Sequence, residues 1–326
     1  MASYKTLPEN ASSLLFWTIE SGNTSIKWRA YRPQLQDNRP TPYPRRYFEP
    51  IAERVLYWSD LKAFNAKDYA SLIAQSFAAE FSQFDLLMGQ AFRGGIAVTN
   101  PRMIAPTELC EALGQLDVTP RLGWSVIDQN HLRGCLQRLD VSTSYSQDVT
   151  IGLDRLLSAL AACHTFGAQQ DALVLISAGT ALTMDCLFVM PSSHCQLLLG
   201  GILPGVERLR NALSDILPVV SQMPSQQYFP ARTTEESCSN GLYWLLSGAL
   251  TEAILQMQAA VSSRGQNPAE VLKIIVCGGD TDGVVAILSE KISSGALSGG
   301  LSPSDLIPLH DWPSQGIVWA LLHMNA

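Results

Sequence analysis

The sequence predicts an α/β protein that consists of two similar halves. Runs of strand-forming residues alternate with runs of helical spacing along its 326 residues, which is the arrangement of α/β domains. A strand, a glycine-containing turn and a returning strand occur at 14–31 and again at 172–189, with Gly22 and Gly179 in equivalent places. Self-similarity of this kind indicates a duplicated fold.

The first half begins with the first of these hairpins. Residues 14–20 and 25–31 are rich in strand formers, and the Ser-Gly-Asn-Thr sequence between them favours a tight turn. The segment 32–50 is rich in proline and is expected to be an insertion without regular structure. Further patterns predict a helix at 63–84, a strand at 95–100, a helix at 107–116 capped by Thr107, and a strand at 124–127.

The second half follows a border that we place at 141–145, which divides the chain into an N-terminal domain, 1–144, and a C-terminal domain, 145–326. Four leucines at helical spacing predict a helix at 152–166, and the second hairpin follows at 172–189. Later patterns predict a glycine turn at 199–205 with a helix starting near Pro204, a long helix from Thr233 toward 262, a strand at 273–277, and a glycine turn before another helix.

Composition restricts the class of protein. The net charge is −7 and the 22 basic residues are spread thinly, so the chain lacks the basic stripe typical of nucleic-acid-binding proteins. We find neither the pattern of a secretory leader nor an apolar run of membrane-spanning length. The seven cysteines contain no C-x-x-C pair. We therefore expect a cytoplasmic protein with reduced cysteines and with no membrane or nucleic-acid partner.

Three features indicate a site for phosphate chemistry. Asp154 lies in the first turn of its helix, where free amides and the helix dipole favour an ionised carboxylate. The turn at 177–180 offers backbone amides and the Thr180 hydroxyl to a phosphate, and the glycine pair at 278–279 lets a nucleotide approach the backbone. This combination suggests phosphoryl transfer. The competing interpretation is that Asp154 only caps its helix and that Arg155 is a solvated or paired charge.

Six motifs in this order resemble the motif series of type III pantothenate kinases, a family of the acetate and sugar kinase, Hsp70 and actin superfamily. The motifs are E-S-G-N-T-x-I-K-W at 20–28, Y-x6-G-L-D-R at 145–155, S-A-G-T-A-L-T-M-D at 177–185, G-G-I-L-P-G at 200–205, T-x-E-x4-G at 234–241 and C-G-G-D at 277–280. The resemblance implies a duplicated actin/Hsp70-like (ribonuclease H-like) fold of two domains, with mixed sheets flanked by helices. It also implies ATP-dependent phosphorylation of the primary hydroxyl of pantothenate, the first step of coenzyme A biosynthesis.

The resemblance further implies roles for individual residues. Asp154 corresponds to the catalytic proton acceptor. The implied pantothenate-binding residues are Tyr145, Gly152, Leu153, Asp154, Arg155 and Thr234. The implied ATP-binding residues are Glu20, Ser21, Gly22, Asn23, Thr24, Ser25, Ile26, Lys27, Thr180, Gly278 and Gly279.

The resemblance implies magnesium at Glu20, a monovalent cation (potassium or ammonium) at Ser177, and a homodimer with pantothenate at the subunit interface. Both hairpins of the family carry an aspartate where this sequence has Glu20 and Ser177. Glutamate keeps the charge but extends it by one methylene, roughly 1.5 Å, whereas serine removes it. Gln147 and Asp148 also replace an Asn-Pro pair of the family pattern.

Other interpretations remain open from the residues alone. Lys27 can be a solvated strand charge, Tyr145 a loop aromatic that packs on the core, and Thr234 a helix cap. Trp312 and Trp319 are expected in the core or at an interface. The histidines (131, 164, 194, 310 and 323) lack the spacing of a metal site. The competing functions are another small-molecule kinase of the superfamily and a non-catalytic regulatory relative. Glu20 and Ser177 favour the regulatory relative, and the retained Asp154-Arg155 pair argues against it.

Overall fold

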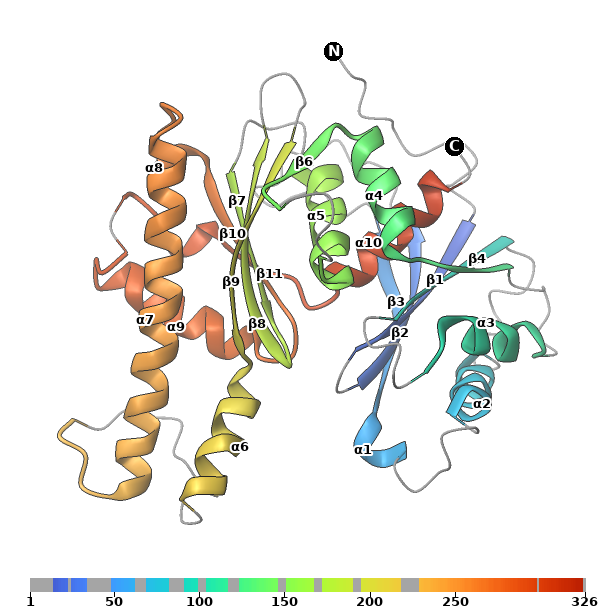
Figure 1. Ribbon diagram of the computed structural model, residues 1–326, viewed down its shortest axis with the longest axis horizontal. Helices are drawn as coiled ribbons and strands as arrows, with labels where there is room; N and C mark the ends of the chain where they lie inside the picture. Colours follow the sequence, from blue (N-terminus) through green and yellow to red (C-terminus); the bar gives the residue numbers. More distant parts are fainter. Residues whose placement is uncertain are drawn as a thin grey trace.

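The protein contains two mixed β-sheets, each with helices on both faces (Figure 1). The computed structural model describes residues 14–22, 25–33, 48–61, 69–81, 91–98, 104–116, 123–145, 151–166, 172–189, 195–217, 229–297 and 299–324. None of the helices in these ranges has the length and apolar character needed to cross a membrane.

The first sheet has the strand order β3-β2-β1-β4-β5. Its β1–β2 and β2–β3 pairs are antiparallel, whereas its β1–β4 and β4–β5 pairs are parallel. The strands are β1 (Leu14–Ser21), β2 (Ser25–Pro33), β3 (Phe48–Tyr57), β4 (Ala91–Val98) and β5 (Gly123–Val126). The helices of this half are α1 (Trp58–Leu61), α2 (Tyr69–Phe81), α3 (Pro106–Gly114) and α4 (Gln129–Arg138).

The second sheet repeats this order as β9-β8-β7-β10-β11, with the same directions and with β6 added beside β9. Its strands are β6 (Val141–Thr143), β7 (Ala172–Ala178), β8 (Ala181–Val189), β9 (Cys195–Pro204), β10 (Leu272–Cys277) and β11 (Leu306–Pro308). The remaining helices are α5 (Leu153–Phe166), α6 (Val206–Ile216), α7 (Thr234–Ser262), α8 (Pro268–Val271), α9 (Thr281–Ser293), a 3-10 turn (Pro303–Asp305) and α10 (Trp312–His323). The repeated order confirms the predicted α/β class and its duplication.

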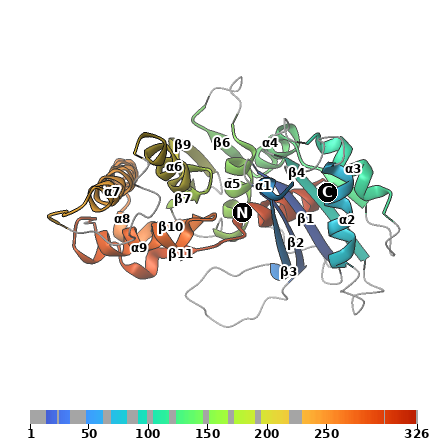
Figure 2. The ribbon, with the colours of Figure 1, turned by 90° about the horizontal axis from the view of Figure 1, so that it is seen from below.

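Alternation along β1 explains how the first sheet is covered. Trp17 and Ile19 face the core formed with α2 and α3, whereas Phe16 faces the core formed with α5 and α10. On the far face of the second sheet, α7 and α9 cover a further apolar core (Figures 1 and 2).

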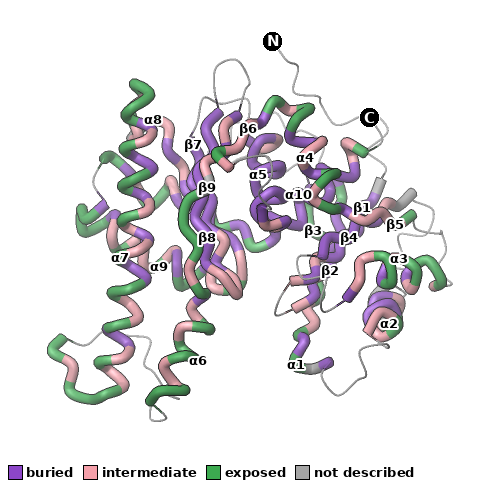
Figure 3. The backbone as a smooth tube through the Cα atoms, in the orientation of Figure 1, coloured by how far each residue is buried: buried purple, intermediate pink, exposed green. Residues whose placement is uncertain are grey.

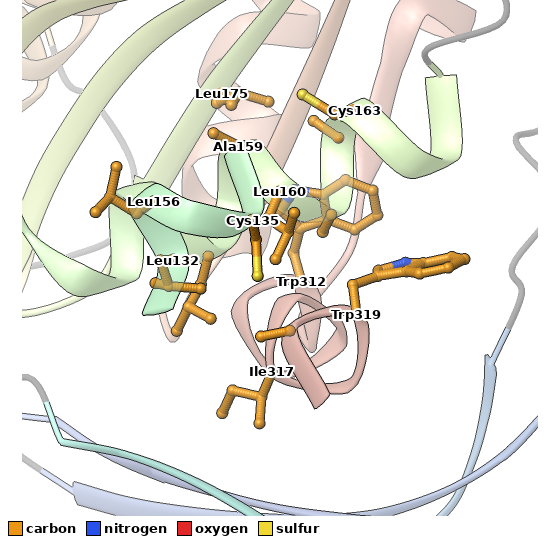
Figure 4. Close-up of a cluster of buried hydrophobic side chains, with 14 of the residues drawn as sticks. Leu132, Cys135, Leu156, Ala159, Leu160, Cys163, Leu175, Trp312, Ile317 and Trp319 are labelled. Carbon is orange, nitrogen blue, oxygen red and sulfur yellow. The ribbon is translucent and has the colours of Figure 1, made fainter. Parts of the chain in front are cut away.

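The central core joins the two halves through α5 and α10 (Figure 4). Trp312 and Trp319 are buried there, as expected, and Trp312 Nε1 donates a hydrogen bond to the Ser158 carbonyl at 3.1 Å. Through α10, the end of the chain returns to pack on the first sheet, while β6 pairs within the second. The domain division at 144/145 stays a prediction.

Local patterns predicted several boundaries wrongly. The ends of the proline-rich segment are strand: β2 runs to Pro33 and β3 begins at Phe48, while 34–47 lie outside the described residues. Pro50 is tolerated because β3 is an edge strand. Thr107 is not a cap, since the helix begins at Pro106. Residues 199–204 belong to strand β9 rather than to a glycine turn, and α4 and β6 were not predicted.

Candidate active site

A cleft of about 620 Å³ lies between the two halves, a size typical of small-molecule sites. Both hairpin turns contribute to it. Of the residues predicted for the site, those that line it are Glu20, Gly22, Ser25, Lys27, Asp154, Ser177, Thr180, Gly278 and Gly279. The fold therefore brings the predicted phosphate turns and the predicted catalytic acid to one place.

The first wall of the cleft is one face of strands β1, β2 and β3. Glu20 pairs across the ladder with Lys27, and Lys27 pairs with Val55. Two residues further along β2, Arg29 pairs with Glu53 of β3. Because residues two apart on a strand share a face, these side chains all line the cleft.

Arg29 is a buried cation at the base of this wall, with a side chain only 2% exposed. It donates hydrogen bonds to Glu53 at 2.6 Å and to the Ser314 hydroxyl at 2.7 Å. That hydroxyl donates to Glu20 at 3.2 Å, and the Arg29 guanidinium lies 3.8 Å from the same carboxylate oxygen. Burial opposes the charge of Arg29, but Tyr31 and the two carboxylates outweigh it and raise its pKa. Glu20 is thus held by residues of β2 and α10.

The second wall is built from the β7–β8 turn and the glycine pair after β10. Gly278 has φ +107°, and a Cβ there would meet the Ala178 carbonyl oxygen at 2.4 Å, so glycine is required. The Asp280 amide donates to that same carbonyl at 2.9 Å, which fixes the start of α9 beside the turn. Burial raises the pKa of the Asp280 carboxyl, and the charge of Glu207 raises it further.

Asp154 occupies the first turn of α5, as predicted, and lines the cleft. Burial raises its pKa, and the neighbouring charge of Glu20 adds to the rise, while the backbone amide of Arg155 opposes it. A carboxylate with a raised pKa in a cleft is typical of a general base or acid.

Arg155 is engaged away from the cleft. Its guanidinium forms a two-pronged ion pair with Asp185 on β8, with Nε 2.9 Å from one carboxylate oxygen, and both side chains are 4% exposed. The Tyr145 ring lies 5.8 Å from the centre of this guanidinium. The Gly200 amide donates to Asp185 as well, at 3.1 Å. The ion pair with Asp185 agrees with the interpretation of Arg155 as a paired charge. The predicted contact between Arg155 and the substrate stays a prediction.

The other predicted residues lie outside the lining of the cleft. Ser21 and Ile26 are buried within the first sheet. Gly152 and Leu153 precede Asp154 at the start of α5 and do not line the cleft. Thr234 starts α7, but the helix cap is Thr233, whose hydroxyl accepts from the Glu236 amide. Asn23 and Thr24 lie outside the described residues.

Several residues of the cleft were not predicted from the sequence. They are Arg29, Glu53, Val55, Tyr57, Ala181, Glu207, Arg208, Asn211, Asp280, His310 and Pro313, whereas Gly179 belongs to the turn predicted at 177–180. Two of them carried a signal in the sequence: Asp280 ends the C-G-G-D motif, and the spacing of Arg29 from Lys27 places both on one face of β2.

The donor set suits magnesium better than a monovalent cation. Magnesium is usually bound by one or two carboxylates together with substrate phosphates. Glu20 offers a carboxylate at the cleft, and Asp154 lies close enough for the charge of Glu20 to raise its pKa. Among the described residues, no cluster of three or more acidic, histidine or cysteine side chains could hold a metal without a substrate. At Ser177 the side chain is neutral, and its partner across the β7–β10 ladder is the buried Cys277, whose pKa burial raises to about 12. The residues there do not fit the charged cation site that the resemblance implied.

The matches to known proteins agree with the motif series. Residues 124–256 match the family model of type III pantothenate kinase. A type III pantothenate kinase from Legionella pneumophila (strain Corby) is 31% identical over 162 residues, which cover 48% of this chain and 60% of that protein. The one from Methylobacillus flagellatus is 27% identical over 160 residues, covering 48% of this chain and 59% of that protein.

The match therefore spans about 60% of the length of these curated relatives. Among solved structures, a glucokinase from an Antarctic psychrotroph aligns over 96% of this chain and 99% of its own, with 13% identity and a TM-score of 0.45. The motifs at 20–28 and 277–280 lie outside the segment that the family model matches. Through residues 124–256, the chain is similar in sequence to the type III pantothenate kinases.

Proposed function

We propose that this chain transfers the γ-phosphoryl group of ATP to the primary hydroxyl of pantothenate, the first step of coenzyme A biosynthesis. The observation that carries the proposal is that Asp154, a carboxylate with a raised pKa, lines the same cleft as both glycine turns. Phosphoryl transfer needs alignment and charge stabilisation more than covalent help, and such a cleft supplies both.

In the proposed mechanism, Asp154 accepts a hydrogen bond from the pantothenate hydroxyl and takes its proton as the bond to phosphorus forms. The turns at Gly22 and at Gly179 and Thr180 line the cleft and would hold the phosphates in line. Lys27, on the same wall as Glu20, faces the developing negative charge. Magnesium, held by Glu20, would neutralise part of the phosphate charge when bound.

Turnover with ATP and pantothenate, measured by following phosphopantothenate, tests the proposal directly. Asp154→Asn should lower kcat by about a hundredfold or more, the range usual for loss of a general base. Asp215→Asn is the matched control, because Asp215 is exposed in the last turn of α6 and does not line the cleft. Unchanged turnover in Asp154→Asn would remove this residue from the mechanism.

The same assay addresses the cation. Because Ser177 provides no charge, we expect turnover to require magnesium and to change little when potassium or ammonium replaces sodium. A strong requirement for potassium would show that hydroxyl and carbonyl oxygens suffice at this position.

A homodimer forms part of the proposal. Much of the backbone of α6 and α7 belongs to exposed residues (Figure 3). Large apolar side chains are exposed on or next to these helices: Phe229, which precedes α7, is 86% exposed and Trp244 is 56% exposed. A patch of this kind is typical of an interface. Thr234 starts α7 outside its own cleft, so its predicted contact with pantothenate requires the cleft of a second subunit. Light scattering should give twice the 35.5 kDa chain mass.

A regulatory protein without turnover is the second candidate. The ion pair between Arg29 and Glu20 and the neutral Ser177 favour it, because both reduce the negative charge available to cations in the cleft. Nucleotide binding without any transfer to pantothenate or to a panel of small alcohols would support this function.

A cytoplasmic location is part of the proposal for the pantothenate kinase, because it follows from the proposed substrates.

A further inference from the structure

Trp58 holds the first phosphate turn from outside the cleft. Its indole Nε1 donates a hydrogen bond to the Gly22 carbonyl at 2.9 Å, and the side chain is 4% exposed. The ring packs edge-on against Tyr69, with centroids 5.7 Å apart. Gly22 lines the cleft and Trp58 does not. The carbonyl is thus bonded to a fixed donor that is not part of the cleft lining.

The second half contains an equivalent contact made with different chemistry. Trp58 is the first residue after β3, and Gly205 is the first residue after β9, the strand that takes the place of β3 in the second sheet. The Gly205 amide donates to the Thr180 carbonyl at 2.9 Å. A Cβ at Gly205 would meet the Gly179 carbonyl oxygen at 1.9 Å, so this close approach requires glycine. In each half, the residue after the third strand bonds a carbonyl of the phosphate turn.

The chemistry of phosphate binding explains why this contact recurs. A turn binds an anion through its N–H groups, and a carbonyl oxygen that faced the anion would repel it. A donor placed outside the cleft satisfies the carbonyl and holds its peptide group in one orientation before nucleotide binds. Such preorganisation increases affinity because less conformational entropy is lost when the ligand binds.

We infer that Trp58 is a positioning residue for nucleotide: its indole N–H holds the Gly22 carbonyl away from the phosphates and fixes the orientation of Gly22 before nucleotide binds. This inference rests on the proposed use of ATP and does not depend on the identity of the phosphoryl acceptor. In the second turn, Gly205 has the same role.

Trp58→Phe removes the donor and keeps an aromatic ring. The matched control is Trp28→Phe, because Trp28 is also buried in the apolar core of the first sheet, and its Nε1 has no hydrogen-bond partner among the described residues. Replacement of Trp58 by benzothienylalanine, in which sulfur replaces the N–H of the same fused rings, removes the hydrogen bond without changing the packing.

Calorimetric titration with magnesium and the non-hydrolysable ATP analogue AMP-PNP, without pantothenate, is the measurement. Trp58→Phe and the benzothienyl variant should each raise the Kd about five- to tenfold, which corresponds to loss of one net hydrogen bond of about 1 to 1.4 kcal/mol. Trp28→Phe should stay within about twofold of the parent. The KM for ATP should rise in parallel, with the KM for pantothenate unchanged.

A benzothienyl variant that binds the analogue as tightly as the parent would overturn the inference, as would an equal loss in Trp28→Phe. A parent chain that binds no AMP-PNP would overturn it together with the proposed function. The titration omits pantothenate. A chain that binds AMP-PNP but does not phosphorylate pantothenate would therefore refute the proposed function, while the Kd values of the variants would still test the role of Trp58.

Discussion

Removing either partner of the ion pair between Arg155 and Asp185 should be one of the most destabilising single changes in the second half. The pair links the first turn of α5, which carries Asp154, to the middle of β8, and both side chains are 4% exposed. Removing one partner of a buried pair leaves an uncompensated charge, which costs about 3–5 kcal/mol. Arg155→Met and Asp185→Asn should each lower the free energy of unfolding by that amount.

The double variant distinguishes a specific pair from general disruption. Met replaces the arginine stem, and Asn still offers an oxygen to the Gly200 amide, so no buried charge remains. The double variant should lose no more than either single variant, whereas independent effects would add to about 6–10 kcal/mol. Urea unfolding followed by circular dichroism gives these values. Arg210→Met, which breaks an exposed pair with Glu207, is the control and should cost less than about 1 kcal/mol.

Losses below about 1 kcal/mol in both single variants, or strictly additive losses in the double, would refute the reasoning. The same proteins also test the predicted contact of Arg155 with substrate. If Arg155 acts only through Asp185, the double variant should keep the KM for pantothenate.

Two further predictions concern pH. The pKa of Asp154 is raised by burial and also by the charge of Glu20, so turnover should fall as pH decreases through this raised pKa. Glu20→Gln should move the fall in turnover to lower pH. The pH profile of kcat at saturating magnesium checks this prediction, and an unchanged profile in Glu20→Gln would contradict it. Burial and the proximity of His323 lower the pKa of His164 from 6.5 to about 3, so only the unfolded chain gains this proton between pH 6.5 and 4.5. Stability is therefore lost as pH falls, and in urea unfolding the free energy of unfolding of His164→Phe should fall by about 2–3 kcal/mol less than that of the parent over this interval. Parallel curves for His164→Phe and the parent would contradict the pKa assignment.

Local patterns predicted the parts of the site that depend on short-range geometry. The two hairpins, the helix that carries Asp154 and the glycine pair after β10 all lie where their sequences indicated. A glycine turn between two strands or a run of leucines at helical spacing reports the conformation of its own residues, so the prediction needs no knowledge of distant contacts.

Strand β3 shows why the remaining elements could not be predicted in the same way. Its first residues, Phe48 to Pro50, belong to the proline-rich segment that was expected to lack regular structure, and they form a strand by pairing with β2. That pairing places Glu53 and Tyr57 in the cleft and Trp58 beneath the first turn. The role of Arg155 was similarly ambiguous, because a basic residue after Asp154 can bind substrate or an internal carboxylate.

The sequence by itself determined a duplicated α/β chain with a glycine turn between two strands in each half and with Asp154 at the start of a helix, because the turns and the helix depend on local patterns. Only the tertiary structure decided how those parts are held. Arg29 and Ser314 are 285 positions apart and meet beside Glu20, because α10 returns across the first sheet. Contacts over such separations depend on how the sheets and helices pack, and residue spacing along the chain does not encode them.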